Sequence, residues 1–302
     1  MKELSGVYYF SSGSVGLEIF RELIKRGLEI DKVITIPDRP KGRGRKLKPP
    51  EIKIEAEKLG IEVLQAERPE EIDFRERPQF IVVADYGKIL RKKTLQLPKI
   101  APLNIHPSLL PMYRGAAPIE RAMMDGYPLG VSIIIMNERI DAGEIILQEK
   151  IEYSIEETKG DVIPRIASKG AELLIKSMEL LSKGEANPRP QEGPSSYARK
   201  IKKDELWVNF RENHIKVVRK INALSPTPTA RTMLGDLYLK LYRAKPSSME
   251  LKPGEIWMDK KQLVIGAEGG SVELLEVQPS GRRKLSAEEF IKGYARKLRA
   301  NT

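Results

Sequence analysis

The stretch Asn104-Ile-His-Pro-Ser-Leu-Leu-Pro-Met-Tyr-Arg-Gly-Ala-Ala-Pro118 places an amide, an imidazole, a hydroxyl and a guanidinium within eleven residues that also contain two prolines. The chain has only two histidines, and His106 ends a short apolar run in this stretch. Residues 103–106 are predicted to form a strand, so Asn104 and His106, two positions apart, project to the same side. We therefore look for chemistry at the carboxyl end of this strand.

Short runs rich in Val and Ile alternate with helical patterns on both sides of this stretch. The strand predicted at 80–84 is the most clearly buried. Buried strands of this composition, alternating with helices, are typical of a doubly wound, Rossmann-like parallel sheet, which places ligands at the carboxyl ends of its strands. The other predicted strands are 6–10, 33–36, 61–64, 131–136 and 145–153, and the predicted helices are 15–26, 50–59, 116–125 and 162–181, the last capped by Thr158 and Asp161.

The composition changes abruptly in a segment rich in Pro, Gly and Ser, which predicts a linker at 188–206 between a domain at 1–187 and a second domain at 207–302. The second domain contains four short strand patterns separated by turns, which predicts a small, OB-like β-barrel. Ser286 and Glu289 form a predicted capping box at the start of its last helix. The strand patterns are 237–242, 255–258, 262–265 and 272–277, and a helix is predicted at 210–224.

The composition restricts the chemistry. The 302 residues include no cysteine and two histidines, so disulfides and thiolate sites are excluded and no metal is expected. No N-terminal signal pattern and no apolar run of about 18 residues is present. We expect a soluble, cytoplasmic protein that acts as a monomer.

The net charge of +11 is unevenly distributed. Residues 1–187 carry 30 Lys and Arg against 29 Asp and Glu, whereas residues 188–302 carry 23 against 13. A basic module attached to a neutral one suggests that a polyanion is held by one and modified by the other. The alternative is a lysine-rich solvated surface of the kind found in heat-adapted proteins.

Together with Asp141-Ala-Gly143, the stretch from Asn104 to Ile119 resembles the signature of the folate-dependent formyltransferases. Four further segments resemble segments of that family, at 37–49, 84–90, 196–201 and 278–286. Two departures stand out. Ser11-Ser-Gly-Ser14 replaces the usual Gly-Thr-Pro, and Asp85 stands where a small apolar residue is commoner.

The resemblance implies transfer of a formyl group from 10-formyltetrahydrofolate to the amino group of methionyl-initiator tRNA, in support of translation initiation. Such a transfer passes through an oxyanion, which needs a hydrogen-bond donor, and it needs a group that handles protons. Asn104 suits the first role and His106 suits both. Asp141 could orient His106, although Asp-x-Gly after a strand is often only a turn.

The resemblance also implies binding residues. The folate pocket would include Ser108, Leu109, Leu110, Pro111, Tyr86, Gly87, Ile89 and Leu90, although the leucines could equally be core residues. A loop carrying six basic residues would engage the tRNA acceptor stem through Arg39, Lys41, Arg43, Arg45, Lys46 and Lys48. Charge runs of this kind are often only solvated surface. Arg114 could hold either a folate carboxylate or a phosphate.

Two other functions remain open from the sequence. A formyltransferase that acts on a small amine, such as an amino-sugar nucleotide, would share the same core motif, but it would need neither the basic loop nor a basic second domain. A non-catalytic RNA-binding protein with a degenerate enzyme core is the other alternative. The intact set of Asn104, His106 and Asp141 argues against it.

Overall fold

The computed structural model describes residues 4–41 and 46–299, and the chain divides into two compact units. The first unit comprises 1–116, 130–151 and 163–198, and the second comprises 117–129, 152–162 and 199–302. Residues 188–198, which composition assigned to a linker, are part of the first unit. The second unit also takes two segments, 117–129 and 152–162, from the predicted first domain. In the described part of the chain, no helix has both the length and the apolar character needed to cross a bilayer.

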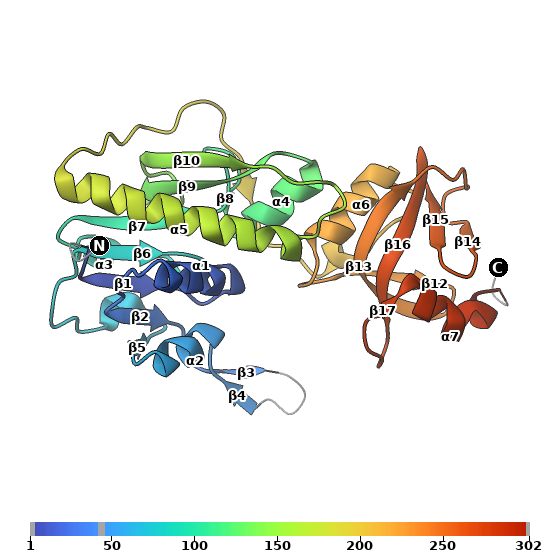
Figure 1. Ribbon diagram of the computed structural model, residues 1–302, viewed down its shortest axis with the longest axis horizontal. Coiled ribbons are helices and arrows are strands. Elements are labelled where there is room, and N and C mark those ends of the chain that lie inside the picture. Colours follow the sequence, from blue (N-terminus) through green and yellow to red (C-terminus); the bar gives the residue numbers. More distant parts are fainter. Residues whose placement is uncertain (1–3, 42–45, 300–302) are drawn as a thin grey trace. The chain divides into compact units, whose positions relative to one another are not determined.

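The first unit is built on a seven-stranded sheet (Figure 1). Five neighbouring strands are parallel, and β9 runs antiparallel to β7. This confirms the predicted α/β fold class with its parallel central sheet. In spatial order the strands are β10 (Ile145–Ile151), β9 (Leu129–Ile135), β7 (Ala101–His106), β6 (Phe80–Val83), β1 (Val7–Phe10), β2 (Lys32–Thr35) and β5 (Glu62–Gln65).

Both faces of the sheet are covered, but by different kinds of structure. Helices α1 (Ser14–Lys25) and α5 (Lys159–Lys183) lie over one face in Figure 1. Gly170 permits a close approach of α5, because a Cβ there would lie 3.0 Å from Cγ2 of Ile105. The opposite face carries a cluster that includes Tyr8, Phe10 and Tyr86. Leu95 of α3 (Lys92–Leu95) belongs to this cluster. Ile72, which follows η1 (Pro69–Glu71), packs on it together with Phe74 and Leu97 from irregular segments.

Several short elements were not predicted. The basic loop forms a hairpin of β3 (Arg39–Lys41) and β4 (Lys46–Lys48), and Arg43 and Arg45 lie outside the described residues. Strand β8 (Arg114–Gly115) pairs in parallel with β11 (Tyr197–Ala198). Arg189 also forms a bridge with Ile145. These pairings explain why 188–198 belong to the first unit. The remaining helix of this unit is α2 (Glu51–Lys58).

The second unit contains a six-stranded antiparallel sheet in the C-terminal part of the chain, where four short strands of a β-barrel were predicted. Its strands are β12 (Ala230–Leu234), β13 (Leu237–Ser247), β16 (Gly270–Pro279), β15 (Leu263–Ala267), β14 (Ile256–Met258) and β17 (Leu285–Ser286). Its helices are α4 (Pro118–Asp125), η2 (Asp204–Leu206), α6 (His214–Ala223) and α7 (Ala287–Arg299). The predicted capping box is confirmed, since Ser286 N–H donates to Glu289 and Glu289 N–H donates to the Ser286 hydroxyl.

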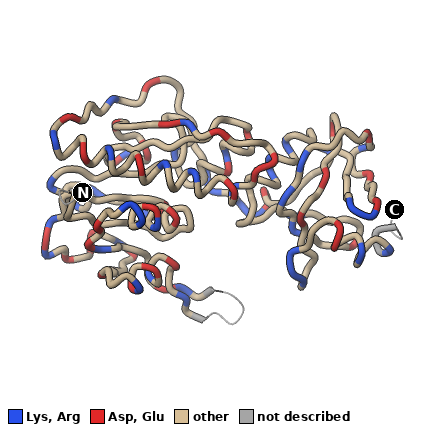
Figure 2. Tube along the Cα trace, in the orientation of Figure 1, with Lys and Arg blue, Asp and Glu red and all other residues tan. Residues whose placement is uncertain are grey.

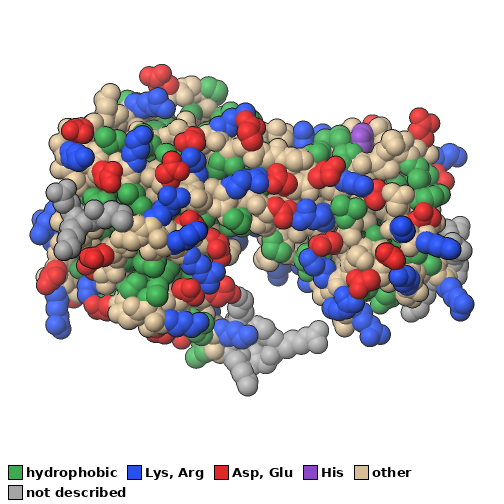
Figure 3. Space-filling model, in the orientation of Figure 1, with side chains coloured by type: hydrophobic (Ala, Val, Ile, Leu, Met, Phe, Trp, Pro, Cys, Tyr) green, Lys and Arg blue, Asp and Glu red, His purple; other side chains and the backbone are tan. Residues whose placement is uncertain are grey.

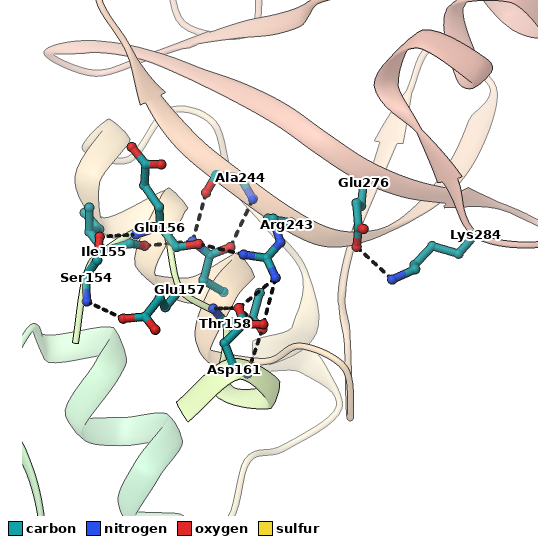
Figure 4. Close-up of polar contacts among 11 residues, drawn as sticks. Ser154, Ile155, Glu156, Glu157, Thr158, Asp161, Arg243, Ala244, Glu276 and Lys284 are labelled. Carbon is teal, nitrogen blue, oxygen red and sulfur yellow. Dashed lines mark hydrogen bonds and ion pairs between the residues drawn. The ribbon is translucent and has the colours of Figure 1, made fainter. Parts of the chain in front are cut away.

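The segment 152–162 is tied to the sheet of the second unit by polar contacts (Figure 4). Two nitrogens of Arg243 on β13 bond to Glu156 and Asp161: Nη1 donates to the Glu156 carbonyl at 3.2 Å, and Nη2 donates to both Asp161 carboxylate oxygens at 2.9 and 2.7 Å. Asp161 also accepts from the Thr158 N–H, which confirms the predicted cap of α5. The Asp161 carboxylate therefore caps the first turn of α5 and also accepts bonds from Arg243.

Candidate active site

The two polar residues predicted on one strand both lie near the carboxyl end of β7. Asn104 is 8% exposed and His106 is 4% exposed. Their backbones pair with Ile134 and Ser132 of β9, respectively, so the strand is held on both sides. Asp141 comes from the loop between β9 and β10 and adopts a left-handed backbone conformation, with φ of 47°. The β-sheet therefore positions two side chains and a loop supplies the third.

Asp141 is the centre of this cluster. Its Oδ1 accepts a hydrogen bond from Nδ2 of Asn104 at 3.1 Å, and its Oδ2 accepts from the Gly115 N–H at 2.8 Å. The same Oδ2 lies 3.6 Å from Nδ1 of His106. The structure thus brings together the three side chains predicted to be catalytic, and it adds the Gly115 amide as a fourth group.

The hydrogen bond on the far side of His106 defines its tautomer. Nε2 lies 2.9 Å from the Tyr113 carbonyl oxygen. A carbonyl can only accept, so Nε2 carries a proton in both charge states of the ring. In the neutral ring Nδ1 is therefore the basic nitrogen, and it is the one that faces Asp141.

Sequence reasoning missed one residue of this site. Gln191 lies in the segment assigned to a linker, yet its side chain bonds to Arg114 and to the backbone of the Asp141 loop. Arg114, whose partner the sequence left open, donates to Gln191 Oε1 through Nε at 3.0 Å and Nη2 at 2.6 Å. The strand pairing of Ala198 with Gly115 is what brings this segment back to the site. No local pattern in the sequence indicates such a pairing.

The residues that the resemblance assigns to folate binding differ in exposure. The side chains of Ser108, Leu110, Tyr86 and Leu90 are buried. Ser108 donates to the Met112 carbonyl, and Leu110 packs with Ile134 and Ile145. Leu109 and Pro111 are half-buried, whereas Gly87 is exposed and Ile89 is 68% exposed. The buried side chains shape the site, while the exposed ones are available to a ligand.

The phenol of Tyr86 lies in the cluster on the face of the sheet opposite α1 and α5. Its ring meets Phe10 edge to face, with centroids 5.5 Å apart. Burial, with a smaller contribution from nearby Glu67 and Glu70, raises the pKa of Tyr86 to about 12. The phenol therefore stays neutral at physiological pH and serves as packing.

The two departures from the family pattern fit each other. The Asp85 carboxylate accepts from the Val15 N–H at 3.1 Å, at the start of α1, and its carbonyl accepts from the N–H groups of Ser12 and Gly13. A Cβ on Gly13 would lie 1.9 Å from an Asp85 carboxylate oxygen. The glycine in the first turn thus makes room for the aspartate that caps the helix.

In the basic hairpin, Arg39 donates to Glu67 at 3.1 Å, and Lys88 reaches the same carboxylate at 2.6 Å. These two cations, Lys88 first, lower the pKa of Glu67. Lys48 is exposed. Figure 2 shows basic residues both at this hairpin and at the turn between β16 and β17 of the second unit, where Arg282, Arg283 and Lys284 are exposed.

Comparisons with known proteins identify the family of the chain. A model of formyl transferases matches residues 7–178, and a model of the formyl transferase C-terminal domain matches residues 200–295. The chain is 36% identical to the methionyl-tRNA formyltransferase of Thermodesulfovibrio yellowstonii over 96% of both chains. It is 40% identical to that of Natranaerobius thermophilus, over 91% of this chain and 93% of the relative.

Solved structures are similar in fold. HypX from Aquifex aeolicus, in complex with tetrahydrofolic acid, superposes with a TM-score of 0.68 at 19% identity and covers 98% of this chain and 48% of HypX. An N-formyltransferase from Helicobacter canadensis, in complex with folinic acid and dTDP-3-aminofucose, gives 0.65 at 18% identity over 91% of this chain and 99% of the other. Because the sequence relatives match the chain over almost its whole length, the chain belongs to the methionyl-tRNA formyltransferase family.

Proposed function

We propose that this protein transfers a formyl group from 10-formyltetrahydrofolate to the amino group of methionyl-initiator tRNA, and that it thereby supports translation initiation. The observation that carries the proposal is the cluster of Asn104, His106 and Asp141 at the carboxyl end of β7. It offers a neutral amide donor and a buried imidazole around one carboxylate, with Asn104 hydrogen-bonded to Asp141 at 3.1 Å and Nδ1 of His106 lying 3.6 Å from it. Acyl transfer to an amine needs a donor to the oxyanion and a group that handles protons.

The residues near this cluster fit a folate. The exposed side chain of Ile89 lies two residues from the exposed backbone of Gly87, so the loop after β6 offers apolar surface next to backbone polar groups. A planar ring with hydrogen-bonding edges suits such a surface. We propose that Tyr86, Gly87, Ile89 and Leu90 border the ring, with Ser108, Leu109, Leu110 and Pro111 shaping the other wall. The bound co-substrate would supply the formyl group.

The roles of the three side chains follow from their contacts. The methionyl amine attacks the formyl carbon, the new C–N bond forms, and the bond from that carbon to N10 of the folate breaks. Asn104 uses one amide hydrogen on Asp141 and has a second for the developing oxyanion. His106 can accept the amine proton at Nδ1 and return it to the departing nitrogen. Asp141 stabilises the imidazolium that forms in between.

We propose a division of labour between the units. The first unit holds the folate and the reacting groups, and the basic hairpin binds tRNA phosphates through Arg39, Lys41, Arg43, Arg45, Lys46 and Lys48. The predicted second domain, 207–302, would provide the other basic surface. The excess of ten positive charges in residues 188–302 supports this role. A tRNA substrate also implies work in the cytoplasm, and we propose that the protein acts there as a monomer.

A formyl-transfer assay with 10-formyltetrahydrofolate and competing acceptors tests the proposal. We expect methionyl-initiator tRNA to be formylated with a kcat/KM at least about 10³-fold above that for dTDP-amino sugars or free methionine, because small acceptors gain nothing from the basic surfaces. Preference for an amino-sugar nucleotide would overturn the assignment. Monomer molecular mass by light scattering, with and without tRNA, checks the proposed oligomeric state.

A further inference from the structure

We propose that Gln191 is a positioning residue that holds the Asp141 loop in the conformation needed for formyl transfer. The inference rests on the proposed function, because it assigns Gln191 a task that matters only if the Asp141 carboxylate takes part in the reaction. Among the hydrogen bonds of the described residues, those of Gln191 reach the loop backbone and Arg114, so Gln191 acts on the carboxylate through the loop.

The amide of Gln191 uses its full hydrogen-bonding capacity. Nε2 donates to the carbonyl oxygens of Asp141 and Gly143, each at 2.8 Å. Oε1 accepts the two bonds from Arg114. The orientation of the amide is unambiguous, because turning it over would set an oxygen against two carbonyls and an NH2 group against a guanidinium. One side chain therefore links Arg114 to both carbonyls that flank Ala142.

The Asp141 loop needs such a support. Residues 137–140 are exposed, and Asp141 has φ of 47°, a left-handed conformation that is unfavourable for a non-glycine residue. At the other end, Gly143 is packed so closely that a Cβ would lie 1.7 Å from the Ile135 carbonyl oxygen. The bonds from Gln191 hold the Asp141 carbonyl relative to this fixed point, which offsets the unfavourable backbone conformation.

The contacts form a closed ring around the catalytic carboxylate. Arg114 bonds to Gln191, Gln191 bonds to the Asp141 backbone, and the Asp141 side chain accepts from the N–H of Gly115, the next residue after Arg114. Each bond in the ring limits the movement of the others. The partner of Arg114 is thus Gln191. The positive charge of Arg114 favours the orientation of the Gln191 amide in which its oxygen faces the guanidinium.

Substitutions at Gln191 separate this role from a merely structural one. Gln191→Ala removes all four bonds, and Gln191→Glu keeps an acceptor for Arg114 while losing both donors to the loop. We expect both variants to lower kcat about 10- to 100-fold with KM for tRNA changed less than about threefold, since misplacement by about 1 Å costs up to about 10²-fold. Glu192→Gln, at the exposed neighbouring position, is the matched control and should keep the parent kcat.

A double-mutant cycle shows whether Gln191 acts through Asp141. Asp141→Asn alone should reduce kcat strongly, and adding Gln191→Ala should reduce it no further, because the carboxylate that Gln191 positions is already gone. Equal fold-losses in both backgrounds would overturn the inference and leave the catalytic assignment standing. Full turnover in Asp141→Asn would instead overturn the catalytic assignment, and the positioning role with it.

Hydrogen exchange in the free protein gives a readout independent of turnover. We expect amides of residues 137–144 to exchange at least about tenfold faster in Gln191→Ala and Gln191→Glu than in the parent and in Glu192→Gln, with exchange in β7 unchanged. Unchanged protection of the loop in both Gln191 variants would overturn the proposal. If Gln191→Ala fails to fold, Gln191→Glu carries both measurements, because it retains the bond to Arg114.

Discussion

His106 shows how a single side chain can be oriented by groups that do no chemistry. The Tyr113 carbonyl fixes the proton on Nε2, and Tyr113 is itself held by the hydrogen bond from its N–H to the Ser196 hydroxyl at 2.9 Å. The ring therefore presents Nδ1 to Asp141. The Asp141 oxygens are meanwhile occupied by Asn104 and Gly115, so the carboxylate cannot rotate away. The three side chains form one unit, and their individual contributions should not be additive.

The histidines of the chain allow a matched test at the residue scale. His106→Ala should lower kcat about 10²- to 10⁴-fold, the usual contribution of a general acid and base. His214→Ala, in the second unit, removes an imidazole that lies 3.3 Å from the Glu268 carbonyl and should keep nearly full turnover. Single-turnover formyl transfer measures the rates, and filter binding checks that tRNA affinity is retained. Comparable rates in the two variants would remove His106 from the mechanism.

At the scale of elements, the buried side chain of Asn222 on α6 links separate parts of the second unit by hydrogen bonds. It is 1% exposed, and its Nδ2 donates to the carbonyls of Ile155 and Ala244, both at 2.8 Å, while its Oδ1 accepts from the Ala244 N–H at 3.0 Å. The two residues that Asn222 contacts, Ile155 and Ala244, lie next to the contacts of Arg243 in Figure 4. A helix, a strand and the segment before α5 are thus joined by one amide.

Asn222→Ala should destabilise the second unit by about 2 to 4 kcal/mol, because it leaves buried backbone groups at Ala244 and Ile155 without a partner. Urea unfolding followed by tryptophan fluorescence is suitable, since both tryptophans, Trp207 and Trp257, lie in this unit. Lys216→Ala, at an exposed position of the same helix, is the control and should change stability by less than about 0.5 kcal/mol. A loss of unfolding free energy below about 1 kcal/mol in Asn222→Ala would show that the second unit does not depend on these hydrogen bonds.

The ion pair of Arg121 on α4 with Glu205 of η2 makes stability depend on pH. Bonds from Arg121 at 2.6 and 3.0 Å, and from the Lys202 N–H, lower the pKa of Glu205 from 4.5 to about 2. A carboxyl with a depressed pKa stabilises the fold above its unfolded pKa, and this stabilisation is lost as the pH falls from about 4.5 toward 2. Because the side chain is 31% exposed, we expect only about 1 kcal/mol.

Glu205→Gln tests this contribution. The difference in unfolding free energy between the parent and the variant should be about 1 kcal/mol at about pH 7 and should shrink to less than half at about pH 3. Glu250→Gln, at an exposed position of the same unit, is the control and should show no such trend. An equal difference in unfolding free energy at both pH values would mean that the contribution of Glu205 to stability does not depend on its charge.

Regular elements were predictable to within a few residues, whereas the elements that complete the site were not. The helix predicted at 15–26 is α1, Ser14–Lys25, because apolar periodicity and a closing glycine are local signals. The strands β8 and β11 have two residues each and exist only because distant segments meet. Asn104, His106 and Asp141 were found from the sequence motif, but Gln191 and the Gly115 amide depend on that pairing. Local patterns do not encode tertiary contacts of this kind.

At the scale of the whole molecule, charge distinguishes the two ends of the sequence more clearly than fold does. The first 187 residues are nearly neutral, with basic residues concentrated in the β3–β4 hairpin, and the remainder carries the excess. Figure 3 shows Lys and Arg side chains gathered over β17 and α7 of the second unit. The turn before β17 contains Arg282, Arg283 and Lys284, all exposed. A polyanion bound there would displace counterions, which makes affinity depend on salt.

Replacing Arg282, Arg283 and Lys284 together with Gln should weaken tRNA binding and flatten its salt dependence. Arg283 already pairs with Glu289 and Lys284 with Glu276, so we expect the three residues together to neutralise between one and three tRNA phosphates. The slope of log K against log salt should fall in magnitude by about 0.7 to 2.7, at about 0.7 to 0.9 for each phosphate that the variant no longer neutralises. Filter binding between about 50 and 300 mM KCl measures the slope.

A matched triple change at exposed Lys58, Lys176 and Lys183 of the first unit removes the same charge and should alter the slope far less. Equal slopes in the two triple variants would mean that net charge, and not this turn, determines tRNA binding.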